Sequence, residues 1–267
     1  MAKEVRHILS LSGGKDSTAL AIYMRERVPN MEYVFCDTDK ELPETYDYLA
    51  KLEAFLGKQI VRLRDHGGFD HWLKVYGGYL PSSRMRWCTR MLKIRPFEKY
   101  VGDDPVKMYI GIRGDENRGG YVTSKPNIEP VYPFRDDGIT LPDVHRILEE
   151  SGIGFPKYYE WRTRSGCYFC FYQRKNEWVG LMENHPELFE ESKKYEKTNA
   201  ETGERYTWSE RESLEELCHP ERVAEIKRRQ IASLEGQKKT KPNRPLLEIL
   251  GQDSDDDDDL PCSFCHT

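Results

Sequence analysis

Apolar residues in the first half of the chain gather in short runs that are separated by stretches with helical spacing. The apolar runs predict β-strands over residues 5–11, 32–36, 59–63 and 107–112. The stretches between them predict helices over residues 16–27, 43–56 and 89–100. This regular alternation predicts an α/β fold: a doubly wound parallel sheet of the Rossmann-like type, with ligands at the carboxyl ends of the strands.

The pattern changes after Leu141, where helical segments follow one another without strands. They are predicted over residues 141–151, 174–184, 186–197 and 209–234. We therefore divide the chain into an α/β domain (1–140), a helical region with a Cys-x-x-Cys loop (141–235) and a flexible acidic tail (236–267) that ends in Cys-x-x-Cys-His.

Composition and charge place the protein in a broad class. The net charge of −5 reflects six aspartates at 253 and 255–259, so the rest of the chain is close to neutral. No apolar run approaches the length of a membrane span and no signal peptide is seen, which predicts a cytoplasmic protein without a membrane partner. Seven cysteines in such a chain favour metal or redox chemistry over disulfides.

Residues 12–17, Ser-Gly-Gly-Lys-Asp-Ser, are the most informative stretch. They follow a predicted strand and open a predicted helix, so glycine N–H groups, the helix N-terminus and Lys15 would converge on an anion such as a phosphate. Asp16 is unusual beside an anion and suggests that Mg²⁺ binds as well. The alternative is an ordinary turn rich in small residues.

Two further turns follow predicted strands and should reach the same edge of the sheet. In the first, residues 36–39, Asp37 suits Mg²⁺ or a ribose, or it caps the next helix. In the second, residues 111–116, Arg113 suits a phosphate, or the segment is turn chemistry alone.

Residues 84–99 carry six basic side chains and one acid. Arg86, Arg90 and Lys93 fall on neighbouring turns of a predicted helix and would hold an anionic substrate; the alternative is an ordinary basic surface.

The cysteines suggest a metal centre. Cys167 and Cys170 have the spacing of metal or cluster ligands, and Cys88 is the first candidate for a third ligand. The alternative is a pair of buried structural cysteines, and the spacing does not choose iron from zinc. Further metal or redox candidates are Cys218, which is more simply structural, and Cys262 and Cys265 with His266, whose alternative is a disordered tail.

Four of these segments, in this order, resemble the phosphoadenosine phosphosulfate (PAPS) reductase family of the PP-loop, or N-type ATP pyrophosphatase, superfamily. Residues 12–17 match the PP-loop, residues 111–116 resemble the Gly-Ile-Arg loop and residues 166–170 resemble the cysteine motif. Residues 35–45 resemble an Asp-Thr-Gly-x-Glu-x-Pro-Glu-Thr segment, except that Asp39 replaces the glycine. The resemblance covers roughly residues 5–175.

The resemblance implies an adenine nucleotide alpha hydrolase-type fold and an ATP site. The nucleotide contacts that it implies are Ser10, Ser12, Gly13, Gly14, Lys15, Asp16, Ser17, Asp37, Gly111 and Arg113. Among these, Lys15, Asp16, Asp37 and Arg113 would be catalytic. The expected cofactors are ATP, Mg²⁺ and a 4Fe–4S cluster on Cys88, Cys167 and Cys170, with Zn²⁺ as the alternative.

Three functions compete. The leading hypothesis is an ATP-dependent enzyme that adenylates a substrate, releases pyrophosphate and transfers sulfur, with tRNA or DNA as acceptor, a donor such as a cysteine desulfurase, and a possible homodimer. The complete PP-loop is typical of members that use ATP, and no Glu-Cys-Gly-Leu-His reductase motif is present. The second hypothesis is a PAPS or adenylyl sulfate reductase with Cys265 as nucleophile. The third is a nucleotide-binding accessory subunit without turnover.

Overall fold

The computed structural model describes residues 3–117, 119–120, 125–198, 203–209 and 212–239. It contains two compact units, with the boundary between Tyr168 and Phe169. The first unit extends beyond the predicted division at residue 140 because helix α7 (Leu141–Glu150) packs against α1 (Lys15–Met24).

The first unit is built on a five-stranded parallel sheet with the strand order β3-β2-β1-β4-β5. The strands are β1 (Arg6–Leu11), β2 (Glu32–Cys36), β3 (Ile60–Leu63), β4 (Val106–Tyr109) and β5 (Ile128–Val131). This order is that of a doubly wound sheet, so the predicted fold class is confirmed. The four predicted strands are present, and β5 is an addition at the sheet edge.

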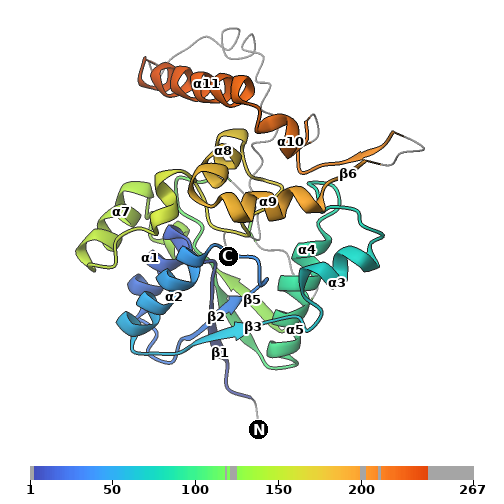
Figure 1. Ribbon diagram of the computed structural model, residues 1–267. Coiled ribbons are helices and arrows are strands. Elements are labelled where there is room, and N and C mark those ends of the chain that lie inside the picture. The colour runs from blue at the N-terminus through green and yellow to red at the C-terminus, as the bar shows by residue number, and fades with distance from the viewer. Residues whose placement is uncertain (1–2, 118, 121–124, 199–202, 210–211, 240–267) are drawn as a thin grey trace. The chain divides into compact units, whose positions relative to one another are not determined.

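Helices cover both faces of this sheet (Figure 1). On one face, Leu9, Leu11 and Phe35 pack with α1, α7 and α2 (Pro43–Leu56). On the other, Ile8 and Val34 pack with α5 (Arg95–Val101). Alternate residues of each central strand therefore enter opposite cores, as the period of two requires.

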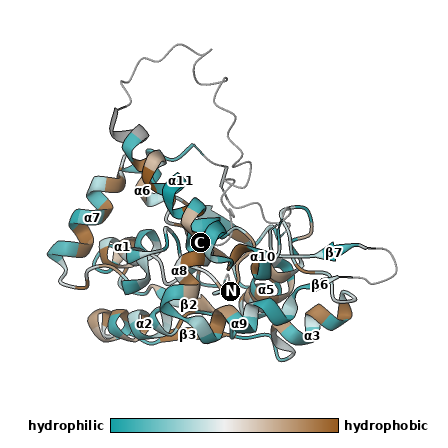
Figure 2. Ribbon diagram, turned by 45° about the horizontal axis from the view of Figure 1, so that its top comes forward, coloured by the Kyte–Doolittle hydropathy of each residue, from teal (hydrophilic) through white to brown (hydrophobic). Residues whose placement is uncertain are grey.

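The helix boundaries follow local chemistry. Helix α2 has the predicted bounds because Pro43 occupies its first turn and Gly57 ends it with a left-handed φ of 63°. At the start of α7, Thr140 and Asp143 form a capping box. Helix α7 carries both hydrophilic and hydrophobic positions (Figure 2), and it buries Val144 and Leu148.

The predicted helix over 89–100 is divided into three parts. It consists of α4 (Trp87–Thr89), the π-helical turn η1 (Arg90–Ile94) and α5. Helix α3 (Gly68–Val75) precedes it and was not predicted. The short helices α6 (Pro133–Asp136) and η2 (Lys157–Glu160), a 3₁₀ turn, complete the first unit.

The second unit is mainly helical, as predicted. It contains α8 (Lys175–Asn184), α9 (Pro186–Tyr195), the antiparallel pair β6 (Lys197–Thr198) and β7 (Arg205–Tyr206), α10 (Leu214–Leu217) and α11 (Pro220–Lys239). The predicted helix over 209–234 is thus two helices, because Pro220 starts a new one. In the part of the chain that the structure describes, no helix has both the length and the apolar character needed to cross a membrane.

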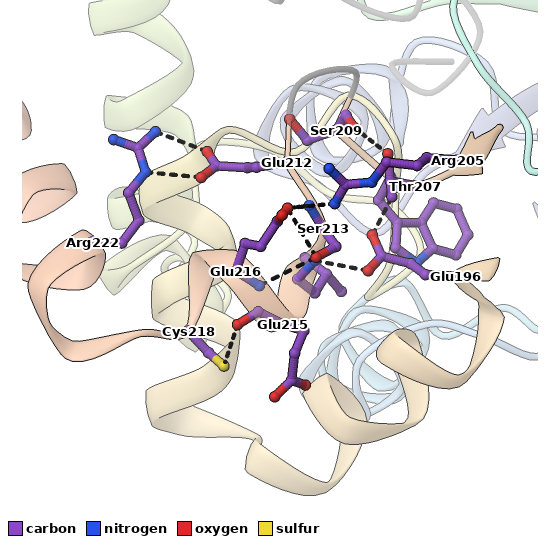
Figure 3. A network of polar contacts seen from close by, with 12 residues as sticks. Glu196, Arg205, Thr207, Ser209, Glu212, Ser213, Glu215, Glu216, Cys218 and Arg222 are labelled. Carbon is purple, nitrogen blue, oxygen red and sulfur yellow. Dashed lines mark hydrogen bonds and ion pairs between the residues drawn. The ribbon is translucent and has the colours of Figure 1, made fainter. Parts of the chain in front are cut away.

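A network of polar contacts closes the second unit around α10 (Figure 3). Ser213 caps this helix: its Oγ accepts a hydrogen bond from the Glu216 amide at 3.2 Å, and its own amide donates to Glu216 Oε2 at 2.7 Å. The Arg205 guanidinium also donates to Glu216. The Arg205 hydrogen bond and the Ser213 amide together lower the pKa of Glu216 to about 2.

This shift predicts a pH-dependent contribution to stability. A carboxylate with a lowered folded-state pKa stabilises the protein above its unfolded-state pKa, and the effect is lost as pH falls toward 2. Glu216 is half-exposed, so we expect Glu216→Gln to cost at most about 1 kcal/mol at pH 7. Urea unfolding of both proteins between pH 7 and pH 3 should show this difference shrinking with acidity; a constant difference would contradict the assignment.

Candidate functional site

The loop at residues 12–17 lies at the carboxyl end of β1 and leads directly into α1, as predicted. Gly13 has a φ of +74°, and a Cβ there would lie only 2.6 Å from Thr45 Cγ2, so only glycine fits without strain. Ser17 ties the loop together: its Oγ accepts a hydrogen bond from the Ser12 amide at 3.1 Å and donates to the Gly14 carbonyl at 3.2 Å. The loop is therefore a tight turn with a defined shape.

Two more loop amides are paired with hydroxyl oxygens. The Gly14 amide donates to Ser12 Oγ at 3.3 Å, and the Lys15 amide donates to Tyr159 Oη at 3.2 Å. Tyr158 donates from its hydroxyl to the Gly13 carbonyl at 2.7 Å. Tyr158 and Tyr159 thus hold the loop from outside, and no local pattern in the sequence predicts these contacts.

The predicted loop at 111–116 reaches the first loop through Arg113. Its Nη1 lies 2.8 Å from Asp16 Oδ1 and 2.7 Å from Glu116 Oε1, and Lys15 Nζ lies 3.3 Å from Asp16 Oδ2. Gly111 allows the close approach, because a Cβ there would lie 3.1 Å from the Asp16 carbonyl oxygen. The structure therefore brings Lys15, Asp16 and Arg113 together, as the sequence predicts.

Asp37 is buried at the end of β2 and is fully paired. Its Oδ1 accepts hydrogen bonds from the Tyr46 hydroxyl at 2.8 Å and the Asp39 amide at 2.9 Å, and its Oδ2 accepts from Arg64 at 2.8 and 3.0 Å. Asp39 has a φ of +64°, which explains why the similar family motif has glycine here. Aspartate tolerates this conformation, and Arg64 also contacts its carboxylate at 3.0 Å.

These carboxylates do not fit a magnesium site as they stand. Both oxygens of Asp16 contact a cation and both oxygens of Asp37 accept hydrogen bonds, so a metal would have to displace arginine or lysine. The prediction that Asp16 and Asp37 hold Mg²⁺ stays a prediction, and no catalytic step is assigned to such an ion.

A buried polar cluster follows the second loop. Thr38 Oγ1 donates to Glu41 Oε1 at 2.8 Å and lies 3.1 Å from Cys167 Sγ, which itself lies 3.7 Å from Glu41 Oε1. Burial raises the pKa of Glu41, and the charge of Lys93 opposes this shift. Among the described residues, no hydrogen-bond donor reaches Glu41 Oε2. Glu41 was part of the quoted motif but was not identified as a site residue from the sequence.

The same surroundings bear on the predicted cluster ligands. Burial and then the charge of Glu41 raise the pKa of the Cys167 thiol. Within the described residues, no group of three or more His, Cys, Asp and Glu side chains is arranged to hold a metal ion. Cys88 and Cys167 belong to the first unit and Cys170 to the second. This ligand set therefore stays a prediction.

The remaining predicted residues are less closely gathered. Ser10 is buried in β1. Arg90 is exposed and Arg86 half-buried, whereas Lys93 is close enough to influence the pKa of Glu41 and Cys167. Cys218 donates to the Glu215 carbonyl at 3.1 Å in the second unit, which fits a structural role. Cys262, Cys265 and His266 lie outside the described residues.

The fold defines a class of α/β proteins with a glycine-containing loop at the carboxyl end of a parallel strand, leading into a helix. Residues 6–127 match the family model described as the phosphoadenosine phosphosulfate reductase domain. These residues carry a PAPS reductase family domain, so the predicted family resemblance is confirmed over this part of the chain.

Known proteins similar to this chain include one relative and two solved structures. An uncharacterized protein of Methanocaldococcus jannaschii is 26% identical over 217 residues, which cover 76% of this chain but only 43% of that protein. The PAPS reductase of Candida auris is 17% identical with a TM-score of 0.49, covering 61% of this chain and 82% of the reductase. A U34-tRNA thiolase of Methanococcus maripaludis with a 4Fe–4S cluster is 15% identical with a TM-score of 0.37, covering 71% and 69%.

Proposed function

We propose that this protein binds ATP at the loop of residues 12–17 and transfers the adenylyl group to a substrate oxygen. The observation that carries this proposal is the complete Ser-Gly-Gly-Lys-Asp-Ser loop, which opens α1 beside Lys15 and Arg113. ATP would enter as its magnesium complex, with the ion as part of the substrate. The N-terminus of α1 and two cationic side chains suit its negatively charged phosphates.

In the proposed reaction, negative charge develops on the leaving pyrophosphate. The substrate oxygen attacks the α-phosphorus, the bond from that phosphorus to the bridging oxygen breaks, and pyrophosphate leaves with the bridging oxygen. The Lys15 ammonium and the N-terminus of α1 would stabilise the charge on the leaving pyrophosphate. Arg113 is held by Asp16 and Glu116 and would help to fix the phosphates.

In the second half-reaction, we propose that the outer sulfur of a persulfide attacks the adenylated carbon, so that a carbon–sulfur bond forms and AMP leaves with the oxygen. The persulfide sulfur would come from a partner such as a cysteine desulfurase. A second thiol then cleaves the S–S bond to the carrier and releases the thiolated product, and an external thiol reductant reduces the disulfide that this forms. Anaerobic purification followed by iron, sulfide and zinc analysis tests whether a metal centre takes part. About four irons and four sulfides per protein chain would support a 4Fe–4S cluster, and their absence would leave a cysteine as the sulfur carrier.

The proposed acceptor is a nucleic acid, either tRNA or DNA. Between Asp70 and Glu98 the chain has six lysines and arginines and no acidic residue, and Arg84 and Arg90 are exposed. Exposed Tyr79 lies in the same segment and would offer a ring on which a base can stack, and exposed Met85 would add an apolar contact. Such a charge distribution suits a polyanion.

Reversing two of these charges should weaken the binding of nucleic acid. We expect Arg84→Glu with Arg90→Glu to reduce affinity for a tRNA or DNA probe at least tenfold and to lower the slope of log affinity against log salt by about 2. Fluorescence anisotropy over a range of salt measures both. The control is Arg25→Glu, at the end of α1 and over the Phe55 ring on the other face of the sheet. Equal loss in both variants would remove the acceptor surface from the proposal.

Pyrophosphate release tests the proposed function itself. Protein, Mg·ATP and a pool of tRNA or DNA should release pyrophosphate, and omitting the acceptor should slow the release. Binding of ATP without any release, across all acceptors tried, would favour an accessory subunit. Turnover of PAPS or adenylyl sulfate to sulfite would favour a reductase.

A further inference from the structure

Tyr159 lies outside the residues that match the family model, and its phenol contacts the loop of residues 12–17. Tyr159 belongs to the 3₁₀ turn η2, and its Oη accepts the Lys15 amide hydrogen bond at 3.2 Å. Its ring also lies 5.2 Å from Lys15 Nζ. The same tyrosine therefore contacts both the backbone donor and the side-chain cation of Lys15.

The segment that carries Tyr159 is fixed against the loop at other points. Ser165 Oγ donates to Ser12 Oγ at 3.1 Å. A Cβ on Gly14 would lie 2.7 Å from Ser165 Oγ and 3.2 Å from Tyr159 Oη, so both hydroxyls lie against the bare Cα of Gly14. This is the close approach to backbone that glycine gives to the oxygens of an anion.

An amide N–H makes one good hydrogen bond. A phosphate oxygen bound by the Lys15 amide would need the position that Tyr159 Oη occupies, so the two acceptors exclude one another. A charged phosphate oxygen accepts more strongly than a neutral phenol, because a charge-assisted hydrogen bond is the stronger kind. The exchange therefore favours a ligand that brings negative charge.

We infer that the Tyr159 hydroxyl is an internal substitute for a phosphate oxygen, and that the pyrophosphate end of the nucleotide displaces it from the Lys15 amide. This inference rests on the proposed nucleotide site and adds that the site selects ligands that carry a pyrophosphate group. Ligands with a pyrophosphate group would complete the exchange, and adenosine would not. Phenylalanine at this position keeps the ring next to Lys15 and removes only the competing oxygen.

Isothermal titration of the full chain with inorganic pyrophosphate tests this inference. We expect Tyr159→Phe to bind pyrophosphate about fivefold more tightly than the unmodified protein does. A change of this size corresponds to one net hydrogen bond. The affinity for adenosine should change little. The control is Tyr100→Phe, which loses a phenol hydrogen bond of 2.8 Å to Glu32 at the start of β2. It should leave pyrophosphate binding unchanged.

Hydrogen exchange supplies a second readout that a merely structural tyrosine would not move. Pyrophosphate should increase exchange in the peptide around residues 156–162 of the unmodified protein, because the ligand releases Tyr159. Weaker or unchanged binding by Tyr159→Phe, or slower exchange in that peptide, would overturn the inference while leaving the nucleotide site intact. No binding of either Mg·ATP or pyrophosphate to the unmodified protein would overturn the proposed function, and the inference with it.

Discussion

Lys15→Met should lower the rate of pyrophosphate release at least a hundredfold while leaving the protein folded. The ammonium group lies at the start of α1, 3.3 Å from Asp16 Oδ2, and under the proposed function it stabilises the charge on the leaving pyrophosphate. Losing one preorganised charge partner of this kind costs about 10²–10³ in rate. Asp16 keeps Arg113 as its partner at 2.8 Å, so the fold does not depend on Lys15.

Two variants make this test specific. Lys107→Met removes a lysine near the start of β4, at the opposite end of the sheet from the loop, and should retain the full rate. Lys15→Arg keeps the positive charge and should recover part of the activity. A Lys15→Met protein that releases pyrophosphate at the unmodified rate would show that the chemistry occurs elsewhere.

Gly13→Ala should destabilise the protein by about 3 kcal/mol. Alanine at a φ of +74° costs about 1–2 kcal/mol, and the new methyl group would lie 2.6 Å from Thr45 Cγ2, which adds about 1–3 kcal/mol of overpacking. Thr45 is fully buried in the first turn of α2, so it has little room to move. Urea unfolding measures the loss.

Gly57→Ala is the matched control for this effect. Gly57 has a φ of +63° but no atom within 4 Å of an added Cβ. Gly57→Ala should therefore lower the free energy of unfolding only by the cost of the left-handed backbone conformation, about 1–2 kcal/mol. The difference between the two variants isolates the contact with Thr45. Equal losses would mean that the loop relaxes away from α2 and is less rigid than its hydrogen bonds indicate.

Sequence periodicity predicted the central fold because the strands and helices of a doubly wound sheet follow one another locally. Strand β5 was not predicted, because its sequence, Ile-Glu-Pro-Val, contains a proline and a charge and is therefore not typical of a strand. The helix over 89–100 was predicted as continuous, but the π-helical turn at Arg90–Ile94 changes its spacing. A π-helical turn holds one residue more than an α-helical turn, and one added residue is too small a change to recognise in the apolar pattern.

The candidate site could be predicted where its residues are neighbours in the sequence. Residues 12–17, Asp37 and Arg113 each follow the carboxyl end of a parallel strand, and Arg113 contacts Asp16 directly. The partners that complete the site come from distant segments: Tyr159 is 144 positions from Lys15, and Arg64 is 27 positions from Asp37. Such pairings depend on tertiary packing, and a single sequence contains no local pattern that specifies them.

Nucleotide choice tests the central claim most directly. Mg·ATP titrated into the protein, with PAPS and adenylyl sulfate as competitors, measures which ligand the loop at residues 12–17 prefers. We predict that ATP binds and that neither sulfonucleotide displaces it at comparable concentration. Preferential binding of a sulfonucleotide would contradict adenylation and make sulfonucleotide reduction the better account.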